Sequence, residues 1–158
     1  PIEGVNENNQ ESEILAILEK YGIRVNPEKA ASVEIWGTGA PMREFLWSEE
    51  MADACVYLME KVDFKDAISV NSSESGLREI RNTHINIGTG KEISIRGLAQ
   101  LIKEKVGFGG ELVFNTSKPD GTMRKLTDPS KLHALGWHHQ IEIGDGVEKL
   151  YQWYLARL

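Results

Sequence analysis

The chain has 158 residues, 41% of them hydrophobic, which is enough for one domain with a substantial core. The formal net charge of −6 disfavours nucleic-acid binding, which requires many neutralised phosphates, but a small anionic ligand needs only a few converging cations. No apolar run approaches the roughly 18 residues that cross a bilayer, and the single cysteine, Cys55, excludes an intrachain disulfide, so we expect a cytoplasmic protein without nucleic-acid or membrane partners.

Local patterns predict a mixed α/β arrangement. Residues 1–11 are polar and lack a secretion signal, and the start at a proline without methionine predicts a piece of a longer protein. Apolar residues at helical spacing predict a helix over 13–22. Residues 33–36 predict a strand, 37–41 a tight Gly/Pro turn and 43–46 a second extended segment, and we expect these three to form a hairpin.

Two residues beside this turn suit a phosphate-bearing ligand. Trp36 offers a flat apolar face for a sugar or a base. Arg43 offers a planar fork of donors that matches phosphate oxygens. The alternative is an ordinary hairpin with a buried tryptophan and a surface arginine, and the segment by itself favours that alternative.

A broad apolar face predicts a well-buried helix over 48–61, with Ser48 as its N-cap. Cys55 lies among apolar residues on this helix, which favours a small buried hydrophobe over a nucleophile. Tyr57 and Lys61 have the spacing of a dehydrogenase pair, but no cofactor loop precedes them. Core packing and a surface charge explain them.

Beyond this helix, polar residues without periodicity predict a surface loop over 62–82, and alternation predicts a strand over 84–88. The following Gly88-Thr89-Gly90 lacks the third glycine of a dinucleotide fingerprint, because position 93 is isoleucine. The remaining patterns predict, in order, a helix over 94–106 capped by Ser94, a strand over 111–114, a short helix over 129–135 and a final helix over 145–157.

A charged turn follows the strand predicted over 111–114. In Lys118-Pro-Asp120-Gly121, a lysine and an aspartate flank a rigid proline, and Arg124 and Lys125 come soon after. Together with Arg43, these cations would suit a diphosphate. A solvated charged loop is an equal alternative.

The histidines lack the spacing and the carboxylate company of a metal site, so no metal is predicted; they are His84, His133, His138 and His139. Three tryptophans have apolar neighbours and are predicted to anchor the core: Trp47, Trp137 and Trp153.

The motifs, taken in order, resemble the C-terminal half of the GDP-L-fucose synthases, a family of extended short-chain dehydrogenase/reductases. They are Trp36-Gly-Thr-Gly-Ala-Pro-Met-Arg-Glu-Phe, His84-Ile-Asn-Ile-Gly-Thr-Gly, Lys118-Pro-Asp-Gly-Thr-Met-Arg-Lys-Leu, Leu135-Gly-Trp and Tyr151-Gln-Trp-Tyr. The resemblance covers about residues 33–155. It implies an α/β substrate-binding domain over 33–158, with a small mixed sheet and helices, preceded by a polar insertion over 1–32 with one helix.

The resemblance also implies a reaction. Family members epimerise C3 and C5 of GDP-4-keto-6-deoxy-D-mannose and reduce C4 with NADPH to give GDP-L-fucose. Their Rossmann half, which binds NADPH and carries the catalytic Ser, Tyr, Lys, Cys and His, is expected to be absent from this sequence. We therefore expect no catalytic, cofactor-binding or metal-binding residue here and no activity of the chain alone.

For the substrate, the resemblance implies that Arg43 and Lys118 contact the diphosphate and that Trp36 borders the sugar. Asp120 would accept hydrogen bonds from nucleotide hydroxyl or N–H groups. We expect the chain alone to expose apolar surface and self-associate, and the full-length enzyme to be a homodimer. Two alternatives stay open: the substrate domain of another nucleotide-sugar epimerase or dehydratase, and a non-catalytic binding module.

Overall fold

The computed structural model describes residues 4–26, 28, 30–69 and 83–157. The chain divides into two compact units, each built from two distant stretches. Unit 1 comprises Pro1–Pro41 and Ser94–Met123, and unit 2 comprises Met42–Ile93 and Arg124–Leu158. The predicted boundary between residues 32 and 33 falls inside a strand of unit 1. The division into an insertion and a substrate-binding domain stays a prediction.

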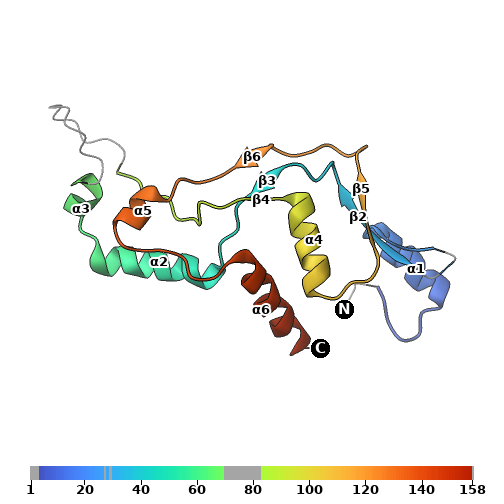
Figure 1. Ribbon diagram of the computed structural model, residues 1–158. Helices are drawn as coiled ribbons and strands as arrows, with labels where there is room; N and C mark the ends of the chain where they lie inside the picture. Colours follow the sequence, from blue (N-terminus) through green and yellow to red (C-terminus); the bar gives the residue numbers. More distant parts are fainter. Residues whose placement is uncertain (1–3, 27, 29, 70–82, 158) are drawn as a thin grey trace. The chain divides into compact units, whose positions relative to one another are not determined.

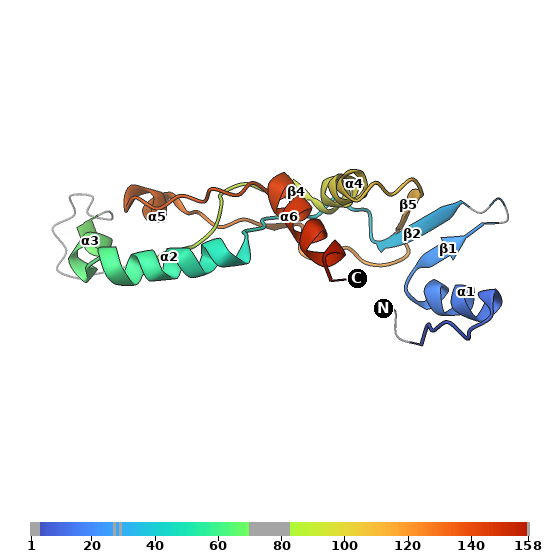
Figure 2. The same ribbon diagram turned by 90° about the horizontal axis from the view of Figure 1, so that it is seen from below.

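Unit 1 contains a three-stranded mixed sheet in the order β1-β2-β5. Strand β2 (Ala31–Trp36) pairs antiparallel with β1 (Ile23–Val25) and parallel with β5 (Glu111–Asn115). Helix α1 (Glu11–Lys20) lies beside β1 in both ribbon views (Figures 1 and 2). Helix α4 (Ile95–Lys105) precedes β5 and begins as the sequence predicts, because the Ser94 hydroxyl accepts a hydrogen bond from the Gly97 N–H at 3.0 Å.

Unit 2 contains short strands and most of the helices. Strand β3 (Met42–Arg43) pairs parallel with β6 (Arg124–Lys125), and β4 (Ile93–Ser94) lies on the other side of β3, where the chain passes from unit 2 to unit 1. The helices of this unit are α2 (Ser48–Lys61), α3 (Phe64–Ser69), α5 (Ser130–Ala134) and α6 (Ile143–Leu155). The predicted α/β class with small mixed sheets is therefore confirmed.

The hydrophobic core of unit 2 forms where α2 meets α5 and the segment that follows it. Its buried residues are Ala54, Leu132 and Trp137. The Trp137 indole N–H donates to the Asp53 carboxylate at 2.8 Å, and the Tyr57 hydroxyl donates to the Leu135 carbonyl at 2.8 Å. Each polar tip thus has a partner while its ring is packed, as buried aromatic side chains require.

Four predictions about local structure are wrong. The expected hairpin does not form, because β2 and β3 belong to different sheets. Residues 84–88 form no strand. The range 62–82, predicted as a loop, contains α3, and residues 70–82 lie outside the described residues. The N-cap of α2 is Trp47 rather than Ser48, without a capping side chain.

Burial also differs from expectation. Helix α2 buries Glu50 and Ala54, but Met59 is 78% exposed and Cys55 is exposed, so the well-buried helix and the buried cysteine are wrong. Of the predicted core tryptophans, Trp137 is confirmed, Trp47 is half-buried, and Trp153 is 54% exposed. An apolar face shows which side of a helix prefers burial but does not supply the element that covers it. Within the described ranges, no helix combines the length and apolar composition of a membrane span.

Candidate functional site

Unit 1 presents an exposed aromatic ring and a lysine at the carboxyl ends of two parallel strands. Trp36 ends β2 opposite Asn115 at the end of β5, and Lys118 follows three residues later. The Lys118 ammonium lies 5.1 Å from the centroid of the Trp36 ring, within cation–π range. Trp36 is 69% exposed, which is unusual for so large an apolar side chain. The carboxyl edge of parallel strands is where open α/β sheets commonly bind ligands.

Hydrogen bonds join the two turns that carry this pair. The Asp120 carboxylate accepts from the Thr38 backbone N–H at 2.8 Å and from the Thr38 hydroxyl at 2.6 Å. The Asn115 carbonyl accepts from the N–H groups of both Gly37 and Lys118, at 3.0 and 3.1 Å. The contacts to Asp120 are charge-assisted and so stronger than bonds between neutral groups.

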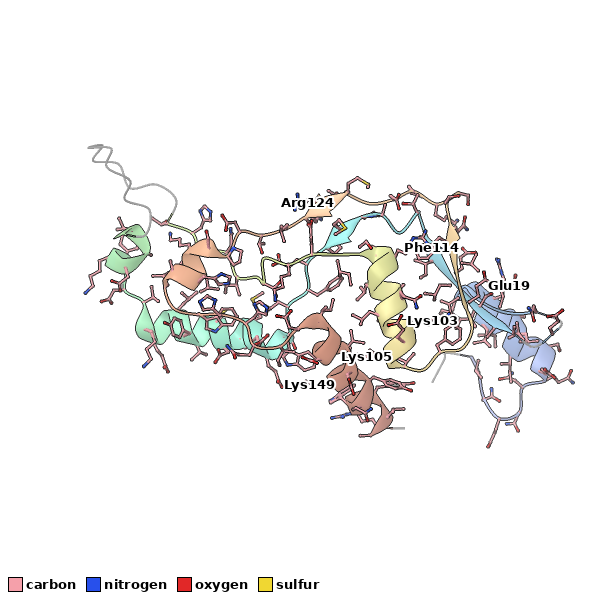
Figure 3. All side chains as sticks on the ribbon, in the orientation of Figure 1. Glu19, Lys103, Lys105, Phe114, Arg124 and Lys149 are labelled. Atoms are coloured by element: carbon pink, nitrogen blue, oxygen red, sulfur yellow. The ribbon has the colours of Figure 1, made fainter. Side chains whose placement is uncertain are left out.

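The other side of the first turn rests on α4. The Arg96 guanidinium donates to the Thr38 carbonyl at 2.7 Å, and the Arg96 backbone N–H donates to the Gly39 carbonyl at 2.9 Å. The guanidinium also lies 3.7 Å from the ring centroid of Phe114. Phe114 lies on β5 and is labelled in Figure 3. Gly39 has φ +75°, and a Cβ there would lie 2.5 Å from the Phe114 ring, so this tight approach requires glycine.

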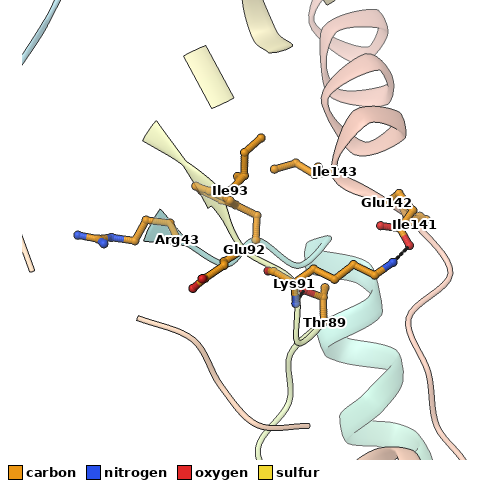
Figure 4. Close-up of a pocket in the computed structure, with 9 residues that line it drawn as sticks. Arg43, Thr89, Lys91, Glu92, Ile93, Ile141, Glu142 and Ile143 are labelled. Carbon is orange, nitrogen blue, oxygen red and sulfur yellow. Dashed lines mark hydrogen bonds and ion pairs between the residues drawn. The ribbon is translucent and has the colours of Figure 1, made fainter. Parts of the chain in front are cut away.

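Arg43 lies on β3 in unit 2 and is half-buried. Its guanidinium donates to the Met42 carbonyl at 2.6 Å, and within the described residues it forms no ion pair. Arg43 lines a cavity of about 250 Å³ together with Thr89, Lys91, Ile93 and Glu142, among others. Lys91 and Glu142 form an ion pair across this cavity, and the Arg43 guanidinium points away from them (Figure 4). Within the described residues, the other donors of this guanidinium have no hydrogen-bond partner.

Glu44, the neighbour of Arg43, organises the loops of unit 2. One carboxylate oxygen accepts from the N–H groups of Thr89 and Gly90, both at 2.6 Å, and the other accepts from the N–H of Thr127 at 3.0 Å and from its hydroxyl. Burial alone would raise the pKa of Glu44, but these hydrogen bonds together hold it below its usual value. A Cβ at Gly88 would lie 2.6 Å from the same carboxylate, so the cluster requires a glycine there.

The three imidazoles near α5 lie close together but are not a metal site. The rings of His133 and His138 stack at 4.3 Å, and burial together with His138 and His139 holds the pKa of His133 below its usual value. Across the described parts of the chain, no three His, Cys, Asp or Glu side chains are arranged to hold a metal ion.

The structure thus brings together Trp36, Lys118 and Asp120 in unit 1. Arg43 belongs to unit 2, and its convergence with Lys118 on one anion stays a prediction. Sequence reasoning missed Thr38, Arg96 and Glu44. The available signals were the Thr38 hydroxyl between two glycines and the Glu44 carboxylate beside Arg43. The hydrogen-bond partners of both are distant in sequence.

Comparisons with known proteins give consistent results. The chain is 42% identical to GDP-L-fucose synthase 1 of Arabidopsis thaliana over 98% of its length, and 42% identical to GDP-L-fucose synthase of Escherichia coli over 90%. These matches cover 43% and 41% of the relatives, so the chain spans about two fifths of their length. The resemblance predicted from the motifs is confirmed.

Solved structures agree with these relatives. A GDP-6-OMe-4-keto-L-xylo-heptose reductase from C. jejuni is 48% identical, with a TM-score of 0.79 over 96% of this chain and 40% of that one. MlghC, a GDP-mannoheptose C4 reductase from Campylobacter jejuni solved with NADP bound, is 46% identical, with a TM-score of 0.75 over 93% of this chain and 38% of that one.

A family model supports the same assignment. The model of the NAD dependent epimerase/dehydratase family matches residues 3–88, which is more than half of the 158 residues. This match includes β2 with Trp36 and β3 with Arg43. The chain belongs to the NAD dependent epimerase/dehydratase family.

Proposed function

We propose that this chain binds the GDP portion of a nucleotide sugar, as the substrate-binding part of a GDP-L-fucose synthase. The observation that carries the proposal is the exposed Trp36 ring with Lys118 above it, at the carboxyl edge of β2 and β5. The similarity to GDP-L-fucose synthases supports a GDP-linked sugar as the ligand. In the whole enzyme, the substrate would be epimerised at C3 and C5 and reduced at C4 with NADPH.

The proposal gives each residue a role that its chemistry supports. Lys118 of unit 1 and Arg43 of unit 2 are each proposed to contact the diphosphate, because neither forms an ion pair within the described residues and both side chains can donate hydrogen bonds to phosphate oxygens. Trp36 borders the sugar, whose apolar C–H face suits an aromatic ring. The family resemblance assigns Asp120 to hydrogen bonds from nucleotide hydroxyl or N–H groups, and its carboxylate also accepts from Thr38.

NADPH is not assigned to residues of this chain. The turn at residues 88–90 superficially suits a phosphate, but the N–H groups of Thr89 and Gly90 already donate to Glu44 at 2.6 Å. These residues therefore do not fit a dinucleotide phosphate. The proposal accordingly assigns no catalytic residue to the chain and expects it to be inactive alone.

Cellular setting and assembly are further parts of the proposal. The enzyme would act in the cytoplasm, where the exposed Cys55 stays reduced. The full-length protein would be a homodimer, and the chain alone would self-associate through exposed apolar side chains such as Met59 and Trp153.

A second candidate is the substrate-binding part of a GDP-heptose C4 reductase. Its support is the higher identity to the two C. jejuni reductases, 48% and 46%, against 42% to the GDP-L-fucose synthases. Both candidates share the GDP group and differ in the sugar. Tighter binding of GDP-mannoheptose than of GDP-L-fucose by this chain would favour the second candidate.

Base selectivity tests the nucleotide assignment. We expect calorimetric titration of the chain to show GDP binding about 10-fold tighter than UDP or dTDP, because a lost base-specific hydrogen bond costs about 1.4 kcal/mol. Equal affinity for the three nucleotides would contradict the GDP assignment, and tighter UDP or dTDP binding would indicate another nucleotide-sugar enzyme.

A further inference from the structure

Two polar residues lie at equal sequence separations from Trp36 and Lys118. Thr38 lies two residues after Trp36, and Asp120 lies two residues after Lys118. The two hydrogen bonds between Thr38 and Asp120, at 2.8 and 2.6 Å, therefore join the turns two residues after the tryptophan and two residues after the lysine. The family resemblance implies no role for Thr38.

We propose that Thr38 and Asp120 form a positioning pair that sets the geometry of Trp36 and Lys118, and that Asp120 affects nucleotide binding through Thr38 rather than by touching the nucleotide. This inference rests on the proposed function. It differs from the direct contact between Asp120 and the nucleotide that the family resemblance implies.

The hydrogen-bonding capacity of Thr38 is taken up within the protein. Its N–H and hydroxyl donate to Asp120, its carbonyl accepts from Arg96 at 2.7 Å, and its hydroxyl also accepts from the Ala40 N–H at 3.1 Å. A side chain engaged in this way has no donor left for a ligand. Thr38 is therefore suited to holding the turn.

The Asp120 carboxylate has its protein partners in the first turn. Each of its carboxylate oxygens accepts from Thr38, and a Cβ added at Gly37 would clash with the oxygen that accepts from the N–H. The backbone of the first turn thus closes over the carboxylate. The half-buried side chain faces that turn, which favours positioning over direct ligand contact.

The pair is needed because the direct contact between the Trp36 and Lys118 side chains is weaker. Lys118 and Trp36 are both exposed, and a cation–π contact in water is weaker than two charge-assisted hydrogen bonds. Without the Thr38–Asp120 bonds, the lysine would sample many rotamers and lose its place over the ring. Affinity would then fall, because ordering the site would be part of the binding cost.

A double-mutant cycle on the whole chain separates the two roles of Asp120. We expect Thr38→Val and Asp120→Ala each to weaken GDP binding about 10-fold, and the double variant to lose no more than the worse single variant. We also expect no further loss when Thr38→Val is added to Lys118→Ala. Additive losses in the double variant would mean that Asp120 contacts the nucleotide itself, which would overturn the inference.

Two controls distinguish positioning from misfolding. Thr38→Ser keeps both bonds and should retain wild-type affinity, and Thr116→Val, at an exposed threonine of the same loop, should leave affinity unchanged. A Thr38→Ser variant as weak as Thr38→Val would contradict the inference.

Amide hydrogen exchange at Thr38 gives a readout that does not depend on GDP. We expect protection in the wild type and its loss in Asp120→Ala, which removes the acceptor of the Thr38 N–H. If the wild type fails to bind GDP while Thr38 is protected, the proposed function is contradicted, but the hydrogen bonds between Thr38 and Asp120 are supported. An unprotected Thr38 in the wild type would overturn the inference separately.

Discussion

Replacing Gly37 with alanine is expected to destabilise the chain by about 3 kcal/mol in chemical denaturation. The residue has φ +82°, where an alanine costs about 1 to 2 kcal/mol. The new Cβ would also clash with Asp120, so the two hydrogen bonds from Thr38 would have to lengthen or break. Charge-assisted bonds of this type are worth about 1.5 to 3 kcal/mol.

Two other glycines of unit 1 separate the backbone cost of this loss of stability from the cost of the contact with Asp120. Gly107 has φ +69°, but a Cβ added there would meet no atom within 4 Å, so Gly107→Ala should show only the backbone cost. Gly109 has neither constraint, and Gly109→Ala should be nearly neutral or stabilising. A Gly37→Ala variant no less stable than Gly107→Ala would show that the contact with Asp120 contributes nothing.

Replacing Glu44 with glutamine is expected to destabilise unit 2 by about 2 kcal/mol, again measured by denaturant unfolding. The carboxylate accepts from three backbone N–H groups, those of Thr89, Gly90 and Thr127. Glutamine has the same size, but its amide N–H₂ would face one of these donors. The exposed Glu60 on α2 provides the control, because Glu60→Gln should change stability little.

The effect of Glu44 should depend on pH. Folding lowers the pKa of Glu44 from 4.5. Its stabilisation is therefore fully present above the pKa of the unfolded state and is lost as the pH falls through the lower pKa of the folded state. The difference in unfolding free energy between wild type and Glu44→Gln should be constant above about pH 6 and shrink below 4.5. A difference that persists unchanged well below 4.5 would contradict this role of the carboxylate.

Local sequence patterns predicted the helices well because capping and periodicity are local properties. The helices predicted over 94–106 and 145–157 appear as α4 and α6, each within two residues at both ends. Strand partners were harder to predict. The Gly/Pro turn at 37–41 favoured a hairpin, yet β2 pairs in parallel with β5, more than 70 residues later. Parallel pairing depends on the whole topology and leaves little local signal.

The segment at 84–88 shows a related limit. Its alternating Ile85 and Ile87 pack against the core of unit 2, and the Asn86 amide donates to the Asp128 carbonyl at 3.1 Å. The apolar pattern is thus satisfied by packing, without a ladder of strand hydrogen bonds. Alternation alone does not distinguish these two outcomes.

The chemistry of the site could be read from residue types, but its geometry could not. A tryptophan, two cations and an aspartate in their motifs predicted a nucleotide-sugar ligand. The bond between Thr38 and Asp120 joins residues 82 positions apart, and the Glu44 cluster joins turns 45 and 83 residues away. Such contacts exist only after folding, which is why the roles of Thr38 and Glu44 were missed.

The most direct test of the account is GDP binding by the wild-type chain and by Lys118→Ala and Arg43→Ala, measured by titration calorimetry. We expect each variant to bind GDP about 10- to 100-fold more weakly, since a charge-assisted hydrogen bond to phosphate contributes about 1.5 to 3 kcal/mol. Lys61→Ala, at an exposed lysine of α2, should bind like the wild type. Wild-type affinity in both site variants, or no GDP binding by the wild type, would contradict the account.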